Sequence, residues 1–265
     1  MEAISTTTLT ESSPTLRCQL AAWTTLAGDP GAIATWRRQS LTAGAGAKPA
    51  SFLKQADDQT VLAVRAVLDA IDRAGWPTRS FADWGVVAGA SFFGRTATAH
   101  AIHRFLDEGA WCVSPHLVPN QSLHAPAGAI SLVLKIHGPN FGVGSGANAA
   151  PDALLLAAAL LADGALPGLW VVLTAYDSEW LPGADGSSTG APVCRAVALA
   201  LTPVDGRADG PLVTFGQSED SQALLPELHV GSLAAELGNR PSRWRLADLN
   251  WVGFDTPPGS WEGIR

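Results

Sequence analysis

Residues 138–153 place small side chains between two apolar stretches, in the order Gly-Pro-Asn-Phe-Gly-Val-Gly-Ser-Gly-Ala-Asn-Ala-Ala-Pro-Asp-Ala. The pattern is typical of a strand that enters a tight turn and leaves it as a helix. Such a turn can present one reactive side chain at the helix N-terminus, where the helix dipole lowers the pKa of a thiol. The run contains no cysteine. That absence bears on function more than any residue that is present.

Two other chemistries are possible at this turn, and the spacing favours neither. Ser145 lies between glycines, but the nucleophile elbow of hydrolases, G-x-S-x-G, needs glycine where this chain has Val143. The glycines of residues 142–146 do not have the G-x-G-x-x-G spacing, although Asp177 follows the next strand where a ribose-binding acid would lie. We therefore expect no nucleotide and no other cofactor.

A third candidate is a polar stripe on a predicted helix. His100, His103 and Asp107 recur on one helix face and offer potential metal ligands. Because no Glu or Cys cluster accompanies them, we interpret the stripe as solvated and expect no metal.

The helices and strands that position these residues are predicted from the spacing of apolar residues and from the residues that cap or end an element. Asp57 and Asp58 cap a predicted helix that ends near Gly75. The wholly apolar residues 169–175 predict a strand covered on both faces. Further strands are expected at 84–90, 141–144, 193–201 and 212–215, and further helices at 96–108, 125–135, 151–162 and 222–237. Residues 42–49 are expected to be a flexible connection and residues 111–124 an irregular loop. The alternation predicts a layered α/β sheet.

Composition narrows the class of protein. The 265 residues are 47% hydrophobic and 15% charged, with a net charge of −7 and a pI near 5.3. No Lys/Arg cluster indicates nucleic acid binding. The N-terminus lacks the pattern of a signal peptide, and the most apolar run, residues 153–162, is too short to span a bilayer. Cys18, Cys112 and Cys194 lack metal-type spacing and are expected to be reduced, mostly buried thiols. We expect a cytoplasmic protein.

Several short motifs occur in a recognisable order. Ser-Pro-His-Leu-Val-Pro-Asn at 114–120 is followed by His-Ala-Pro-Ala-Gly-Ala-Ile-Ser at 124–131, by Gly-Pro-Asn at 138–140, and by the small-residue turn. This order resembles the N-terminal half of β-ketoacyl synthases, which have the thiolase fold. It is most similar to the short chain length factors of bacterial aryl-polyene-type loci. The resemblance covers roughly residues 55–205 and is strongest over residues 112–177.

The resemblance locates the missing nucleophile. The family's cysteine lies seven residues after the asparagine of Gly-Pro-Asn, and counting from Asn140 leads to Ala147, which is followed by Asn148. Family enzymes also need two histidines, or a histidine and an asparagine, from a second half of the fold. After residue 205 too little chain remains for that half, and His229 is the only histidine there. A methyl group cannot form an acyl thioester. The resemblance therefore implies a subunit that is not an enzyme on its own.

The resemblance further implies a fold and partners. We expect an α/β, thiolase-like half, layered α/β/α, with a divergent C-terminal tail. The expected divisions are an N-terminal extension (1–50), a β-ketoacyl synthase N-terminal-like domain (51–216), and a C-terminal helix with a Trp-rich tail (217–265). The implied partners are an active ketosynthase and an acyl carrier protein, in polyketide or fatty-acid-like biosynthesis. Half of this fold exposes an apolar layer, which favours an obligate oligomer.

The resemblance also assigns interface residues. Phe141 and Val143 would lie on the strand that pairs across the two-fold axis of the dimer. His116, Asn120 and His124 would lie in a loop near the partner's acyl channel, with His124 also close to the vestigial nucleophile position.

Two alternatives remain open at this point. One is a thioester-acting enzyme with a repurposed site that uses Ser145 or His124. The other is a homodimer that binds a small apolar ligand in the old acyl tunnel.

Overall fold

The computed structural model describes residues 15–43, 46–48, 50–144, 146–177, 192–204, 210–217, 225–237, 239, 241–247 and 250–255. The strands are β1 (Thr15–Gly28), β2 (Leu41–Ala43), β3 (Gly46–Lys48), β4 (Gly85–Ala90), β5 (Asn140–Val143), β6 (Leu169–Tyr176), β7 (Cys194–Pro203), β8 (Leu212–Gln217), β9 (Ser242–Ala247) and β10 (Asn250–Asp255). The helices are α1 (Pro30–Arg38), α2 (Asp58–Arg73), α3 (Arg95–Glu108), α4 (Leu117–Gln121), α5 (Ala125–Leu134), α6 (Ala149–Ala162) and α7 (Val230–Glu236), with short 3₁₀ helices η1 (Ala50–Leu53) and η2 (Ala110–Cys112).

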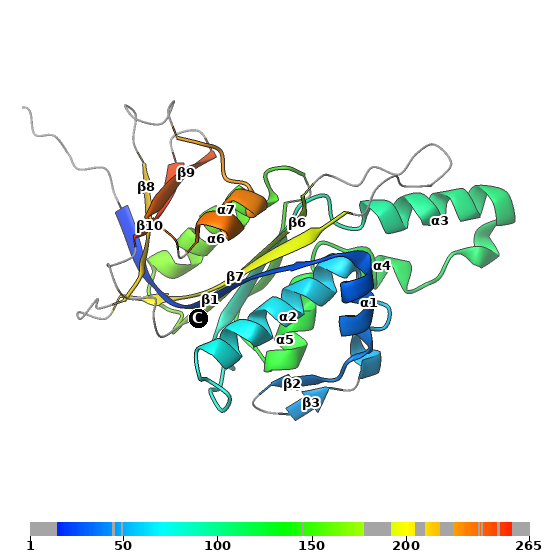
Figure 1. The fold of residues 1–265 in the computed structure, drawn as a ribbon, viewed down its shortest axis with the longest axis horizontal. Helices are drawn as coiled ribbons and strands as arrows, with labels where there is room; N and C mark the ends of the chain where they lie inside the picture. The colour runs from blue at the N-terminus through cyan, green and yellow to red at the C-terminus, as the bar shows by residue number, and fades with distance from the viewer. Residues whose placement is uncertain are drawn as a thin grey trace, which may run out of the picture.

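Eight strands form one mixed sheet in the order β5-β4-β6-β7-β1-β8-β10-β9. Strand β4 pairs in parallel with β5 and β6, and the other neighbours pair antiparallel. Helices α1, α2 and α5 cover one face, and α6 and α7 cover the other (Figure 1). The predicted α/β/α layering is thus confirmed.

Strand β6 shows why the sheet must be covered twice. Its side chains alternate, so that Trp170 and Val172 belong to the core under α2 and α5, while Val171 and Leu173 belong to the core under α6 and α7. All four are buried. The prediction that residues 169–175 form a strand covered on both faces is therefore confirmed.

Helix α2 forms as its sequence predicts. Its N-cap, Asp57, accepts a hydrogen bond from the Gln59 amide at 2.8 Å. Apolar residues at helical spacing form a buried stripe on this helix, and its members are Val61, Val64, Val67, Leu68 and Ile71. This stripe packs against β1 and β7 in the middle of the sheet.

The first strand is the largest feature that the sequence analysis did not predict. Residues 15–28, which that analysis assigned to an N-terminal extension, form β1 between β7 and β8. The signal was the burial of every second residue, Cys18, Leu20, Ala22 and Thr24. A register shift between Leu20 and Ala22 places the first two in the core beneath α6 and α7 and Ala22 in the core under α2. The Ala- and Thr-rich composition obscured this alternation. The prediction of a flexible connection at 42–49 is also wrong for the residues that the structure describes there, because β2 pairs with β3.

The predicted irregular loop at 111–124 contains the short helices η2 and α4.

The C-terminal segment likewise has more structure than expected. Strands β9 and β10 extend the main sheet, and Trp244 is buried against Phe254 with ring centroids 5.7 Å apart. Helix α7 is shorter than the helix expected at 222–237. Trp261 lies outside the described residues.

In the part of the chain that the structure describes, no helix combines the length and apolar character needed to cross a membrane.

The cap of α2 generates a prediction about pH. Burial raises the pKa of the Asp57 carboxyl from 3.8 to about 6. The folded state therefore holds this proton more tightly than the unfolded chain, and stability falls as pH rises from about 4 to about 6. The variant Asp57→Asn keeps a capping side chain but cannot ionise. We expect it to gain on the order of 1–3 kcal/mol over wild type between pH 4 and 7, measured by urea denaturation at several pH values.

Asp57→Ala is the control for capping, because it removes the cap as well as the charge. Its free energy of unfolding should depend on pH in the same way as that of Asp57→Asn, but should be lower by about 1 kcal/mol at every pH. Parallel wild-type and Asn curves across this pH range would contradict the assignment.

Candidate functional site

The small-residue turn has the predicted order of strand, turn and helix. Strand β5 runs parallel to β4, with Val87 opposite Phe141 and Gly89 opposite Val143. Helix α6 then begins at Ala149 with Asn148 as its N-cap residue. Ser145 lies outside the described residues. The turn therefore delivers Ala147 to the N-terminal end of α6, and both Ala147 and Asn148 are exposed.

Helix α6 lies unusually close to the sheet. A Cβ atom on Gly89 of β4 would stand 2.4 Å from the Ala149 carbonyl oxygen and 2.7 Å from the Ala153 Cβ. Backbone therefore packs on backbone at the first turn of α6, which fixes the height of that turn above the sheet.

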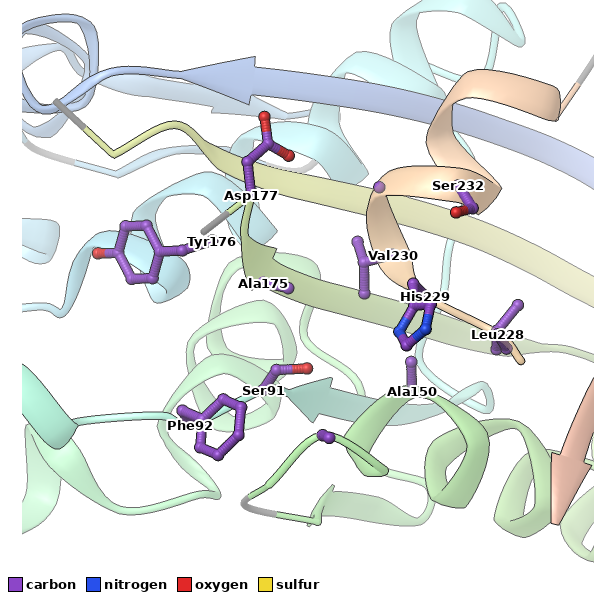
Figure 2. Close-up of a pocket in the computed structure, with 12 residues that line it drawn as sticks. Ser91, Phe92, Ala150, Ala175, Tyr176, Asp177, Leu228, His229, Val230 and Ser232 are labelled. Atoms are coloured by element: carbon purple, nitrogen blue, oxygen red, sulfur yellow. The ribbon is translucent and has the colours of Figure 1, made fainter. Parts of the chain in front are cut away.

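A pocket of about 460 Å³ opens beside this helix end (Figure 2). We call it the Ala147 pocket. Its wall comes from the carboxyl ends of β4 and β6, the start of α6, and the start of α7. The lining residues are Ser91, Phe92, Ala147, Ala150, Ala175, Tyr176, Asp177, Leu228, His229, Val230, Gly231 and Ser232. Ligands of open α/β sheets bind outside the carboxyl ends of strands, so the position is typical of a binding site.

The polar groups of the Ala147 pocket come from separate elements. His229 precedes α7 and directs its imidazole toward Ala150 of α6, while Ser91 follows β4 and Ser232 lies on α7 (Figure 2). These groups supply one possible proton acceptor and two hydroxyls. The wall could therefore orient a polar ligand, and its remaining lining is mainly apolar.

Asp177, at the rim of the Ala147 pocket, forms an ion pair with Arg195. Arg195 Nη2 donates to Asp177 Oδ2 at 2.8 Å, and Arg195 Nε contacts the other carboxylate oxygen. This hydrogen bond raises the pKa of Arg195. Burial raises the pKa of the neighbouring Tyr176 well above its usual range, so its phenol stays neutral. The pair makes Asp177 a structural anchor for the rim.

A second pocket of about 370 Å³ adjoins the first. The two share Ala147, Leu228 and His229 as wall residues. The second is bordered by Asn148 and by Arg245, which pairs with Glu227. Ala147 thus stands where two hollows meet.

The thiols of the chain lie elsewhere. Cys18 and Cys194 are buried, as predicted, and none of the three cysteines forms a disulfide. Burial raises the pKa of Cys18 to about 11 and that of Cys194 well above its usual value. Cys112 donates a hydrogen bond from Sγ to the Gly109 carbonyl at 2.9 Å. No cysteine is among the described residues that line the Ala147 pocket.

The structure separates the loop residues from Ala147. His124 and Asn120 line a third pocket, the α4–α5 pocket, which is bounded by Phe52, Ala56 and Thr60 on one side and by Asn120, His124 and Leu132 on the other. The described walls of this pocket and of the Ala147 pocket have no residue in common.

The remaining predicted site residues occupy the surface. His116 is exposed at the start of α4, where its carbonyl accepts a hydrogen bond from Asn120 Nδ2 at 2.9 Å. Phe141 and Val143 lie on β5, the outermost strand at one end of the sheet.

Sequence reasoning did not select His229 or Ser91 as site residues. His229 had one available signal, since it is the only histidine after residue 205. Ser91 had a weaker one, because it directly follows a buried strand. Neither signal indicates a shared pocket, because the residues are far apart in the chain.

Metal-ligating types do not cluster in the described ranges. Within them, no group of three His, Cys, Asp or Glu side chains is placed to hold an ion. His100, His103 and Asp107 lie on α3 without forming such a group.

Comparison with known families identifies the fold. Residues 21–166, more than half of the chain, match the family model described as "Beta-ketoacyl synthase, N-terminal domain". The chain therefore belongs to the β-ketoacyl synthase family. The match begins inside β1, earlier than the resemblance seen in the sequence, and confirms the family that the motifs predicted.

Solved structures agree with this fold. The ketosynthase ApeO in complex with its chain length factor ApeC from Xenorhabdus doucetiae matches with a TM-score of 0.55 and 16% identity, over 91% of this chain and 99% of the matched chain. The ishigamide ketosynthase/chain length factor matches with a TM-score of 0.51 and 15% identity, over 78% of this chain and 69% of the matched chain. A β-ketoacyl synthase from Burkholderia phymatum STM815 matches with a TM-score of 0.51 and 17% identity, over 80% of this chain and 66% of the matched chain. No curated protein sequence matches the chain.

The packing of the turn generates a stability prediction. A Cβ on Gly142 would lie 1.9 Å from the Leu123 carbonyl oxygen, whereas a Cβ on Gly146 would meet no atom within 4 Å. We expect Gly142→Ala to lower the free energy of unfolding by about 1–3 kcal/mol, because β5 or the turn before α5 must shift. Gly146→Ala is the matched control and should change it by less than about 0.5 kcal/mol. Equal denaturation midpoints for the two variants would contradict this packing.

The exposed position of Ala147 generates a second prediction. The variant Ala147→Cys should present a thiol at the N-terminal end of α6, where the helix dipole lowers its pKa. We expect iodoacetamide at pH 7 to modify it at least about tenfold faster than Cys112, the half-buried native thiol. Peptide mass spectrometry gives both rates from one sample. A thiol at position 147 that reacts no faster than Cys112 would show that the turn does not present this side chain.

Proposed function

We propose that this chain is a non-catalytic β-ketoacyl synthase-like subunit of the chain length factor type. In this proposal it pairs with an active ketosynthase and helps shape a site that acts on acyl carrier protein thioesters, in polyketide or related biosynthesis.

The observation that carries the proposal is the methyl group of Ala147. It occupies the position where the resemblance places the family's nucleophile, just before the first turn of α6 and in the wall of the Ala147 pocket. Acyl transfer through a thioester requires a thiolate at that point. The buried Cys18 and Cys194, with their raised pKa values, offer no replacement.

The edge of the sheet supports pairing with another chain. Strand β5 pairs with β4 on one side, and no other described strand adjoins it. An exposed strand edge carries unpaired backbone groups and readily adds a strand from a partner. Phe141 on this edge has 42% of its surface exposed, which gives the edge an apolar anchor.

The comparisons support the proposed kind of partner. Two similar structures are described as a ketosynthase together with a chain length factor. The match to the complex from Xenorhabdus doucetiae spans 91% of this chain and 99% of the matched chain, so the two chains are similar in length.

A second candidate is a homodimer that binds a small apolar ligand. The Ala147 pocket, with about 460 Å³ and a mainly apolar wall, has a volume suited to such a ligand. The repurposed thioester enzyme receives no support from His124, which lines the α4–α5 pocket and not the described wall of the Ala147 pocket. Its other candidate, Ser145, lies outside the described residues.

The test is co-purification from the native host with an edge variant. Wild-type protein should co-purify, in equal amounts, with a β-ketoacyl synthase that carries the family cysteine, and the native mass should equal the sum of the two chains. Phe141→Asp should lower recovery of that partner by about tenfold or more, because it puts a charge into the apolar interface.

Val204→Asp is the matched control, since Val204 is also an exposed apolar residue, at 37%, but lies beyond the end of β7. It should leave recovery unchanged. A monomer or homodimer without a synthase, or full recovery with Phe141→Asp, would overturn the proposal. A homodimer with co-purified lipid would favour the second candidate.

A further inference from the structure

Helix α3 extends away from the sheet at one end of the molecule (Figure 1). None of its 14 residues is buried, and it packs mainly against the short helices η2 and α4. We call residues 95–112, which contain α3 and η2, the α3 arm. A helix of about 12–15 residues is only marginally stable in water without tertiary packing. The α3 arm therefore lacks the support that the core gives to α2 and α6.

The α3 arm exposes an apolar face. Ile102, Phe105 and Leu106 are exposed and have the spacing i, i+3, i+4, which places them on one face of the helix. Leu106 has 71% of its surface exposed, and Trp111 on η2 has 99%. An apolar stripe on a helix is typical of a face that packs against another surface. The described part of this chain supplies no such surface.

Further exposed apolar residues connect the α3 arm with β5. In the part of the chain that the structure describes, the exposed large apolar residues all lie within residues 102–141, apart from Val204. Two of them, Leu132 on α5 and Phe141 on β5, lie beyond the arm. Helix α4 contacts both α3 and α5, and α5 contacts β5. The arm is therefore linked to the sheet edge through elements that touch one another.

The edge by itself is small for a stable interface. Strand β5 has four residues. A stable interface usually takes about 20–30 residues and about 800 Å² from each partner. A chain that pairs with β5 must therefore contact further surface, and the α3 arm offers apolar surface in the same stretch of chain. Tryptophan is enriched among the few residues that contribute most of the binding energy, so Trp111 is suited to be an anchor.

The polar face of α3 favours a protein as the occupant. This face carries Arg104, Asp107 and Glu108, and Arg104 pairs with Glu108 at 3.2 Å. Helices that lie on a membrane surface are rich in Lys and Arg on the polar face. Here the two acids outnumber the one arginine, so an anionic membrane would gain little from this face.

We propose that the α3 arm is a second contact region for the active ketosynthase subunit, with Trp111 as its anchor and with Ile102 and Leu106 packed against an apolar surface of that subunit. This inference rests on the proposed function, which supplies the identity of the occupant. It extends the interface beyond β5 and gives a role to a helix that its own chain leaves unpacked.

The first test is photo-crosslinking in the native host. The variant Trp111→benzoylphenylalanine should cross-link to the ketosynthase that co-purifies with wild-type protein, and peptide mass spectrometry would identify the captured chain. His103→benzoylphenylalanine, on the polar face of α3, is the control and should give at most about a tenth of that yield. Capture of a second copy of this chain from position 111, or capture of no protein there, would overturn the proposal.

The second test compares two faces of the same helix. Leu106→Asp should lower recovery of the ketosynthase by about tenfold or more, because the new charge would be buried without a partner. Trp111→Ala should lower it by a similar factor, because it removes the anchor. His103→Asp puts the same charge on the polar face and should leave recovery unchanged. Circular dichroism spectra that match wild type would establish that each variant is folded.

These outcomes separate the inference from the proposed function. If wild-type protein recovers the ketosynthase and both Leu106→Asp and Trp111→Ala recover as much, the inference is overturned and the proposed function stands. If wild-type protein recovers no ketosynthase, both are overturned. A homodimer that Leu106→Asp dissociates would make a second copy of this chain the occupant and would also overturn the inference.

Discussion

The backbone contact between α6 and β4 at Gly89 is the constraint on which the candidate site depends. No side chain separates the first turn of α6 from the strand, since a Cβ on Gly89 would lie 2.4 Å from the Ala149 carbonyl oxygen. This contact sets where Ala147 stands relative to the carboxyl ends of β4 and β6. The Ala147 pocket exists because these two strand ends, the start of α6, and the start of α7 converge without filling the space between them.

The two faces of the central sheet carry side chains of different size. In β7, the small side chains of Ala196, Ala198 and Ala200 face α2, whereas Val197, Leu199 and Leu201 face the core beneath α6 and α7. Small residues on one face let α2 pack closely, and larger residues on the other support α6 and the C-terminal strands. Core packing thus holds the site in place without any contribution from a reactive side chain.

A family fold does not by itself preserve the family's chemistry. In this chain a strand and a helix flank the small-residue turn, and Ala147, whose side chain is a methyl group, lies just before the helix. The described residues form a pocket beside Ala147, and β5 has a single neighbouring strand among them. Under the proposed function, these two features would position or complete a partner's site.

The sequence by itself determined the family, the layered α/β class, the capped helix α2, the buried strand β6, and the absence of a nucleophile at position 147. Each depends on local patterns, namely periodicity, caps, breakers and motif spacing. The tertiary structure alone decided that β1 lies in the middle of the sheet, that β9 and β10 extend it, and that His229 shares a pocket with Ala147 while His124 does not. These facts depend on strand order and on contacts between residues far apart in the chain. Local patterns carry no information about which distant segments will pair.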